Sequence, residues 1–184
     1  MKRILHVIRS ADPAGGGPIE VVTRLGIEHR LRGRMVEIAT LDDPDAAFVK
    51  RFPLPIHPLG PVWSKYGYTS RLLPWLRSHA SEFDLVIVNG LWQYTSFAVW
   101  QALRHRTTPY VVFPHGMLDP WFKQRYPLKH VKKWLYWPWA EYRVLRDASA
   151  VLFTSEDERR LAKESFDPLL VGGRSHRAGA AGRP

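Results

Sequence analysis

The chain has 184 residues with 45% hydrophobic content, enough to bury the core of one domain but too short for two full ones. It contains no cysteine, which excludes disulfides and thiolate metal sites and fits a cytoplasmic protein. Neither a signal-peptide pattern nor an apolar run of about 20 residues is present, so we expect no membrane span. The formal net charge of +10 favours an anionic partner, whether a sugar nucleotide, a phospholipid surface or a nucleic acid.

Short apolar runs alternate with helical patterns along the chain. Buried strands are predicted at 3–8, 35–40, 56–59, 84–88, 110–113 and 148–153. Helices are predicted at 19–31, 70–80, 93–104 and 127–145, and from Thr154 onward, with Pro74 breaking the second of them early. Ser155 and Glu158 have the spacing of a capping box at the last helix. This order predicts an α/β fold with a doubly wound parallel sheet, Rossmann-like in type.

A glycine run separates the first predicted strand from the first predicted helix. Gly15, Gly16 and Gly17 are followed by Pro18, which suits the first turn of a helix. Such a loop lets an anion approach the backbone and the positive end of the helix dipole, although an ordinary tight connection has the same composition. The dinucleotide fingerprint fails, because its last position is Glu20, and no Gly-Lys-Ser/Thr sequence completes a P-loop.

Polar residues follow two of the strongest predicted strands. His115 follows the strand 110–113, and Asn89 follows the strand 84–88. Because ligand crevices in open α/β sheets lie at the carboxyl ends of strands, His115 is a candidate sugar, phosphate or proton contact. A histidine here can equally well only hold its loop by hydrogen bonds. The acidic loop 41–45 is expected to be solvated, and no metal site is predicted.

The segment 121–146 is basic and aromatic. It carries seven Lys or Arg and one acid, Glu141, for a local net charge of 7 − 1 = +6, interleaved with Trp and Tyr. The segment could pack its rings on the sheet, or lie on an anionic bilayer surface at the inner face of the membrane. Single-stranded nucleic acid could also stack on such rings, but no recognised motif supports that partner, and nucleic acid is not expected.

The composition changes after Phe166. Residues 167–184 are rich in Gly, Ala and Arg and lack apolar periodicity, so this tail is predicted to be disordered, as an out-of-register or truncated end would be. The expected organisation is therefore one domain, 1–166, and a tail, 167–184.

Together these motifs resemble the N-terminal domain of glycosyltransferase family 4, whose members are retaining, sugar-nucleotide-dependent enzymes with the two-domain glycosyltransferase B fold. The resemblance covers about residues 2 to 166 and rests on the order and spacing of 4–8, 16–18, 89–92, 114–121 and 154–156. It implies that Gly16 and Gly17 approach the donor diphosphate and that His115 contacts the donor sugar near the reaction centre. It further implies that Asn89, Trp92 and Asp119 face the acceptor.

The resemblance also implies binding partners for the chain and a second domain that these residues do not include. The partners would be a sugar nucleotide donor and a saccharide or lipid-linked acceptor, with no cofactor and no metal ion. The family's C-terminal domain, which grips the nucleotide, has no counterpart in these residues, so a weak or inactive glycosyltransferase fragment is expected. The alternative is a non-catalytic binding module of the same fold that uses the segment 121–146 on a membrane surface.

Overall fold

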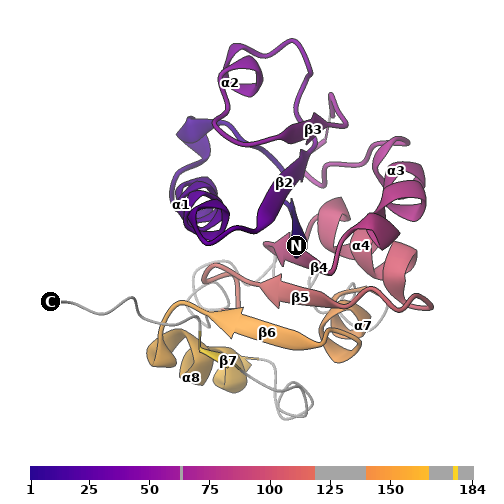
Figure 1. Cartoon of the computed structure of the whole chain (residues 1–184). Helices are drawn as coiled ribbons and strands as arrows, with labels where there is room; N and C mark the ends of the chain where they lie inside the picture. Colours follow the sequence, from indigo (N-terminus) through magenta and orange to yellow (C-terminus); the bar gives the residue numbers. More distant parts are fainter. Residues whose placement is uncertain (63, 119–139, 166–175, 178–184) are drawn as a thin grey trace, which may run out of the picture.

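The computed structural model describes residues 1–62, 64–118, 140–165 and 176–177, and the structural statements below concern these residues (Figure 1). Its strands form one parallel sheet in the order β3-β2-β1-β4-β5-β6-β7. The strands are β1 (Arg3–Val7), β2 (Met35–Thr40), β3 (Ile56–Pro58), β4 (Leu85–Asn89), β5 (Tyr110–Phe113), β6 (Ala150–Phe153) and β7 (His176–Arg177).

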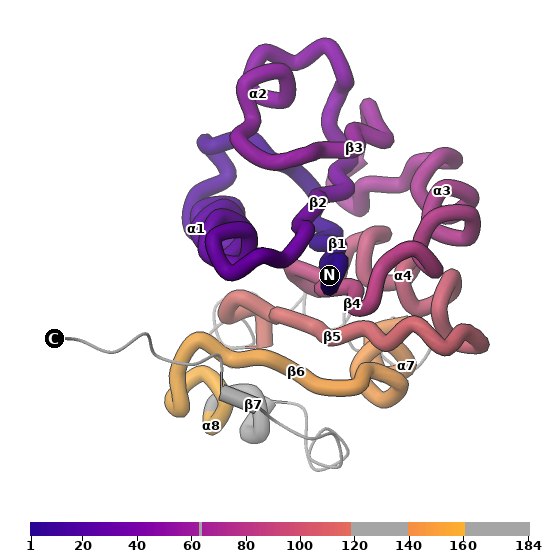
Figure 2. The backbone as a smooth tube through the Cα atoms, in the orientation of Figure 1, coloured from indigo at the N-terminus to yellow at the C-terminus, as the bar shows by residue number. Residues whose placement is uncertain are grey.

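Helices cover both faces of this sheet (Figures 1 and 2). On one face α3, α4 and α7 share a core with β1, β4 and β5, while α1 packs over the other face. The helices are η1 (Pro13–Gly15), α1 (Gly17–Leu31), α2 (Ala47–Lys50), α3 (Leu72–His79), η2 (Ala80–Glu82), α4 (Tyr94–Leu103), α7 (Glu141–Arg146) and α8 (Glu156–Ser165). The predicted doubly wound, Rossmann-like α/β fold is confirmed.

Burial on both faces explains why β1 is apolar along its length. Leu5 and Val7 face α3 and α4, while Ile4 and Ile8 belong to the clusters under α1, as the twofold alternation of a strand requires. His6 shares the α1 face and is fully buried. The one imidazole in this strand therefore lies inside the protein.

The order of the strands reverses at β1. The chain goes from β1 to β2 and β3 on one side, then returns to place β4, β5 and β6 on the other. The loops that follow β1 and β4 consequently separate at their carboxyl ends, which is where open α/β sheets form a ligand crevice. Topology alone places a crevice between these two loops.

Two local predictions need correction. Pro74 does not break its helix: α3 begins at Leu72, so the proline falls in the first turn, where an amide would have no intrahelical partner. Ser155 does cap α8, since its Oγ accepts from the Glu158 N–H at 3.0 Å, but the carboxylate of Glu158 bonds Thr154 instead of completing a capping box with Ser155. Of the tail 167–184, only β7 lies within the described residues.

Gly60 joins the loops that follow β2 and β3. Its N–H donates to the Asp42 carbonyl at 3.0 Å, and a Cβ at this position would lie 2.0 Å from the Leu41 carbonyl oxygen. A rigid backbone atom at that distance leaves no room for a methyl group. The glycine therefore allows the two chain segments to lie in direct contact.

We predict that Gly60→Ala lowers the free energy of unfolding by about 2 kcal/mol or more, because the backbone must move to admit the methyl group. Urea unfolding followed by circular dichroism measures the change. Gly15→Ala is the matched control, since a Cβ at Gly15 meets nothing within 4 Å. Equal stability of the two variants would contradict the packing described for Gly60.

Candidate functional site

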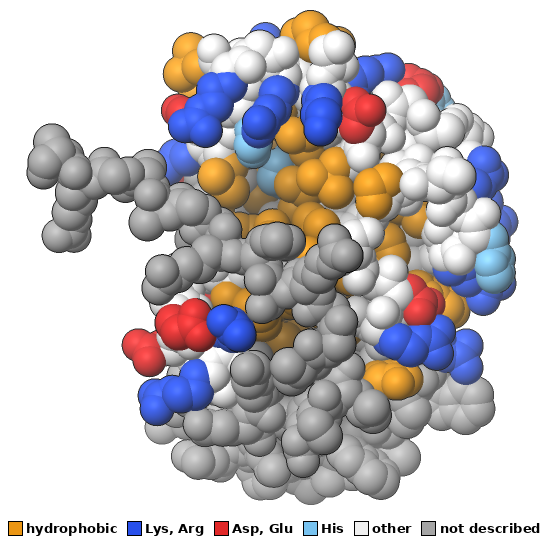
Figure 3. Space-filling model, turned by 60° about the horizontal axis from the view of Figure 1, so that its bottom comes forward, with side chains coloured by type: hydrophobic (Ala, Val, Ile, Leu, Met, Phe, Trp, Pro, Cys, Tyr) orange, Lys and Arg blue, Asp and Glu red, His pale blue; other side chains and the backbone are white. Residues whose placement is uncertain are grey.

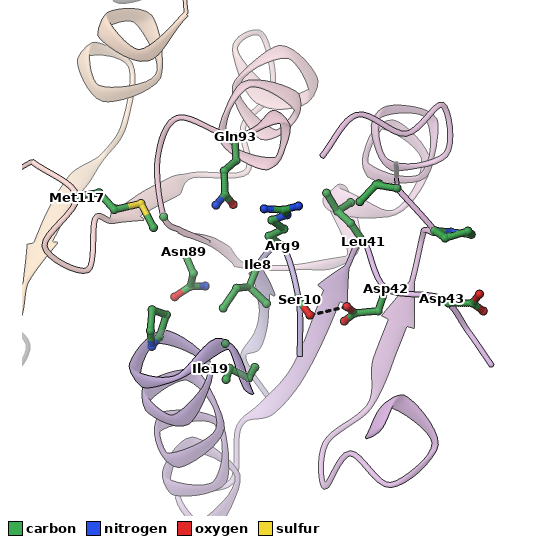
Figure 4. A pocket seen from close by; sticks show the side chains of 15 residues that line it. Ile8, Arg9, Ser10, Ile19, Leu41, Asp42, Asp43, Asn89, Gln93 and Met117 are labelled. Carbon is green, nitrogen blue, oxygen red and sulfur yellow. Dashed lines mark hydrogen bonds between the residues drawn. The ribbon is translucent and has the colours of Figure 1, made fainter. Parts of the chain in front are cut away.

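A cavity of about 480 Å³ opens at the carboxyl ends of β1, β2 and β4, at the point where the strand order reverses (Figure 4). Its walls come from the residues after β1, the acidic loop after β2, the start of α1 and the loop after β4. Asn89, the last residue of β4, lines this space together with Arg9 and Gln93 (Figure 4). We refer to this cavity as the cleft.

Asn89 fixes the floor of the cleft. Its Nδ2 donates to the carbonyl oxygens of Ile87 at 3.1 Å and Val7 at 3.4 Å, and lies 3.2 Å from Nδ1 of His6. Because carbonyl oxygens only accept, these contacts set the orientation of the amide. The Oδ1 atom is left pointing to Nε2 of His115, 3.1 Å away. The side chain is 2% exposed, so it serves as a buried connection between the strands.

His115 is held in a neutral form. An amide oxygen accepts only, so Nε2 of His115 carries the proton and Nδ1 is the acceptor. The ring stacks on Phe113 with centroids 4.1 Å apart, and burial lowers the pKa of His115 to about 4, partly opposed by the charge of Glu158. His115 does not itself line the cleft; it reaches the cleft through Asn89. Its predicted contact with a donor sugar stays a prediction.

The backbone at His115 is left-handed, with φ of 51°, which is uncommon for any residue other than glycine. The loop is secured at the next residue, where the Gly116 N–H donates to Oε1 of Glu158 at 2.6 Å. The other carboxylate oxygen accepts from the N–H of Thr154 at 2.7 Å and from its hydroxyl at 2.6 Å. Glu158, predicted as part of a capping box, therefore joins the loops that follow β5 and β6.

A second carboxylate holds the loop after β4. Oε1 of Glu141 accepts from the Trp92 N–H at 2.8 Å and from the Ser96 hydroxyl at 3.0 Å, and Glu141 is fully buried. The carboxylate lies beside the first turn of α4, where the helix dipole stabilises an anion. Trp92, also left-handed with φ of 63°, donates its indole N–H to the Met117 carbonyl at 3.3 Å. The loops after β4 and β5 are thereby joined.

The glycine run divides two cavities. Gly15 and Pro18 line the cleft, but Gly16 and Gly17 line a second cavity on the opposite side of the run. Gly16 is the N-cap residue of α1 and makes no side-chain hydrogen bond to the first-turn amides. The predicted contact of Gly16 and Gly17 with a diphosphate therefore stays a prediction.

The charged groups at the cleft differ in whether they are engaged by other residues. Arg9 donates to the Ser64 carbonyl at 3.2 Å and forms no ion pair with any described residue. Asp42, predicted to be solvated, is 9% exposed and accepts from the Ser10 hydroxyl at 2.6 Å and the Ala11 N–H at 2.7 Å. Its charge is therefore engaged in holding the loop after β1. The guanidinium of Arg9 and the positive end of the α1 dipole are available to an anion.

The sequence missed the roles of Asp42, Glu141 and Glu158. Asp42 lies two residues after a predicted strand, and that position is the signal that could have identified it. Asp119 and most of the segment 121–146, including 121–139, lie outside the described residues, so neither the acceptor role of Asp119 nor the membrane-surface role of the segment is tested. In the described part of the chain, no group of three or more His, Asp or Glu could hold a metal ion.

Two further properties of the surface concern partners. No helix among the described ranges is both long and apolar enough to cross a bilayer. On the face shown in Figure 3, Lys and Arg side chains lie along the upper edge, and apolar side chains gather in the hollow beneath them.

We predict that Glu158→Ala destabilises the His115 loop, because three donors on Gly116 and Thr154 lose their charged acceptor. The free energy of unfolding should fall by about 1 to 2 kcal/mol, and amide exchange at Gly116 should accelerate about tenfold. The control is Glu156→Ala, whose carboxylate is exposed and pairs with Arg159 at 3.0 Å. Unchanged exchange at Gly116 in Glu158→Ala would contradict this role.

The fold matches solved structures of greater length. HepE from Anabaena, solved with UDP and glucose, shares 17% identity with a TM-score of 0.66, over 96% of this chain and 44% of that one. S. aureus MnaA, solved with UDP, shares 15% identity with a TM-score of 0.57, over 89% of this chain and 40% of that one. MurG from Acinetobacter baumannii shares 12% identity with a TM-score of 0.53, over 100% and 46%. The chain thus spans less than half of each of these proteins.

The sequence comparisons identify the family. The comparison with curated proteins gave no significant match. The profile of the glycosyl transferase 4-like domain matches residues 16–168, which is most of the chain and includes the start of α1, the loops after β4 and β5, and α8. The sheet and its flanking helices correspond to one Rossmann-like half of a glycosyltransferase B fold. The chain belongs to the glycosyl transferase 4-like domain family.

Proposed function

We propose that this chain forms the acceptor-side half of a glycosyltransferase that transfers a sugar from a sugar nucleotide to a polysaccharide or lipid-linked acceptor. The observation that carries the proposal is the cleft at the β1–β4 reversal in a domain of this family. The solved proteins of similar fold include two with UDP bound, which supports a sugar nucleotide as donor.

One side of the cleft suits an anionic ligand, whereas Asp42 and Asp43 line the side after β2. Arg9 offers a cation without a carboxylate partner in the described chain, and the start of α1 offers backbone amides and the positive end of its dipole. A diphosphate between these groups would be neutralised from both sides. The proposed donor binding uses these protein groups.

His115 can contribute as a neutral hydrogen-bonding group. With Nε2 donating to Asn89, Nδ1 is free to accept from a sugar hydroxyl, since it has no partner among the described residues. A neutral ring adds no repulsive charge next to an oxocarbenium-like transition state. We propose that His115 orients the donor sugar near the reaction centre, with Asn89 holding the ring and Trp92 and Asp119 on the acceptor side.

Transfer requires donor and acceptor to be held together, and the cleft provides one wall of such a site. In the family that the sequence resembles, a second domain grips the nucleotide. We therefore propose that this chain alone binds a sugar nucleotide weakly and transfers slowly or not at all. The organisation proposed for the chain is one transferase domain over 1–166, followed by the tail 167–184.

Nucleotide binding by the chain is the direct test. Titration with UDP-glucose, followed by amide NMR, should shift the signals of Arg9, Gly15 and Asn89. Arg9→Gln should weaken binding about fivefold to tenfold, because it removes the cation that lines the cleft. The control is Arg30→Gln, which removes a cation from the last turn of α1, away from the cleft. Absence of shifts at the cleft would refute the proposed donor site.

His115→Ala tests the proposed role in transfer. In a two-domain transferase assembled from this chain and a family C-terminal domain that restores activity, the variant should lower kcat by about a hundredfold, as loss of a positioned polar group does. Product formation is measured by mass spectrometry. Full transfer by His115→Ala would refute the role of this residue, while the donor-binding test above would stand independently.

The pKa values of the two buried histidines predict how stability depends on pH. Burial lowers the pKa of His6 to about 3 and that of His115 to about 4, so the unfolded chain binds protons that the native chain does not. The free energy of unfolding should therefore fall as the pH decreases from about 6.5 to about 4, by up to about 1.4 kcal/mol per pH unit for each histidine.

Urea unfolding at a series of pH values measures this slope. The matched variant is His6→Asn, whose Oδ1 can accept from Asn89 where Nδ1 of His6 does, but which cannot titrate. Its stability should fall less steeply on acidification than that of the native chain. Identical slopes in the two proteins would contradict the buried, neutral state of His6.

A further inference from the structure

A groove lies on the opposite side of the glycine run from the cleft. It encloses about 840 Å³ between η1, the first half of α1, α2 and the residues that follow α2. Its apolar lining includes Ile19, Phe48 and Phe52, which belong to or pack on the small core cluster beneath α1. Both phenylalanine rings are only half-buried. The apolar core of the domain is therefore open to the surface at this point.

The groove and the cleft share a wall. Ile19 lines both cavities, and within the glycine run Gly15 lines the cleft while Gly16 and Gly17 line the groove. A Cβ at any of these three glycines would meet nothing within 4 Å, so the wall is thin and has free space beside it. A single extended ligand could cross this wall with one end in each cavity.

The rim of the groove is cationic. Arg51 is exposed and has no partner among the described residues. The other charges of the lining, Arg24 and Glu20, form an ion pair with each other at 2.5 Å. The unbalanced charge at the groove is therefore positive, and it lies beside an apolar surface.

We propose that this groove binds the hydrocarbon chain of a phosphorylated lipid acceptor, with the phosphate near Arg51 and the glycine run and the sugar-accepting end toward the cleft. The groove offers a matching environment to each part of such a molecule. Its apolar lining suits the hydrocarbon chain, the cation at its rim suits the phosphate, and the wall that it shares with the polar cleft suits the sugar-accepting end. The inference rests on the proposed function for the identity of the ligand as an acceptor and narrows that acceptor to a lipid-linked one.

Binding of farnesyl phosphate to the chain, below its micellar concentration, tests the proposal by calorimetry and amide NMR. Signals of Thr23, Ala47 and Phe48 should shift, and inorganic phosphate should bind about tenfold more weakly, because it lacks the hydrocarbon. Arg51→Gln should weaken the binding of farnesyl phosphate about threefold to tenfold and leave the binding of farnesol unchanged.

Ala47→Trp fills the groove from an exposed position on α2 and should weaken farnesyl phosphate binding about tenfold or more. The matched control is Ile27→Trp, which places an indole on an exposed part of α1 outside the groove and should leave binding unchanged. Equal binding by Ala47→Trp and the native chain would overturn the proposal. The proposal would also be overturned if the native chain binds no lipid but self-associates in sedimentation experiments, and Ala47→Trp abolishes that self-association.

The two proposals fail separately. UDP-glucose shifts at Arg9 and Asn89 report the cleft, whereas farnesyl phosphate shifts at Ala47 and Phe48 report the groove. If UDP-glucose causes no shifts but farnesyl phosphate does, the donor site is refuted, and the groove binds a lipid that is not an acceptor. If farnesyl phosphate causes no shifts but UDP-glucose does, the lipid-acceptor proposal is refuted and the glycosyltransferase proposal is unchanged.

Discussion

The arrangement of the site depends on one side chain, the amide of Asn89. It donates to carbonyl oxygens of β1 and β4 and accepts from His115 after β5, so one buried group fixes three segments relative to one another. A carboxylate in this position could not donate to the carbonyl oxygens, and an apolar residue would leave His115 without a partner. The orientation of His115 thus follows from the hydrogen bonds that the Asn89 amide makes through both its nitrogen and its oxygen.

Two carboxylates supply the remaining constraint. Trp92 and His115 adopt left-handed backbone conformations at the ends of adjacent strands, which costs on the order of 1 kcal/mol for each residue. Glu141 accepts from the N–H of Trp92, and Glu158 accepts from the N–H of the residue after His115. Charge-assisted hydrogen bonds of this kind are strong enough to offset that cost. The loops after β4 and β5 are therefore held by two acids that do not line the cleft.

The fold could be predicted from the sequence because its strands are continuous apolar runs and their order with the helices determines a doubly wound sheet. The site was predictable only in part. Asn89 ends β4 and His115 lies two residues after β5, so their meeting at one edge follows from the topology. The carboxylate of Glu158 reaches Gly116 from 42 residues away along the chain. No local pattern contains that contact, and a solvated acid at the start of a helix has the same sequence signal.

The glycine run shows most clearly why composition alone is insufficient. Three consecutive glycines indicate close approach of some group to the backbone, but they do not indicate from which side. In the folded chain Gly15 lines the cleft, whereas Gly16 and Gly17 line the groove, because η1 ends at Gly15 and the backbone turns at Gly16, where φ is 77°. A ligand that touches either side meets the same first-turn amides and the same helix dipole. Occupancy of the groove by an anionic lipid and of the cleft by a diphosphate would therefore be coupled through one short stretch of backbone, and two negative charges there would compete for the same positive potential.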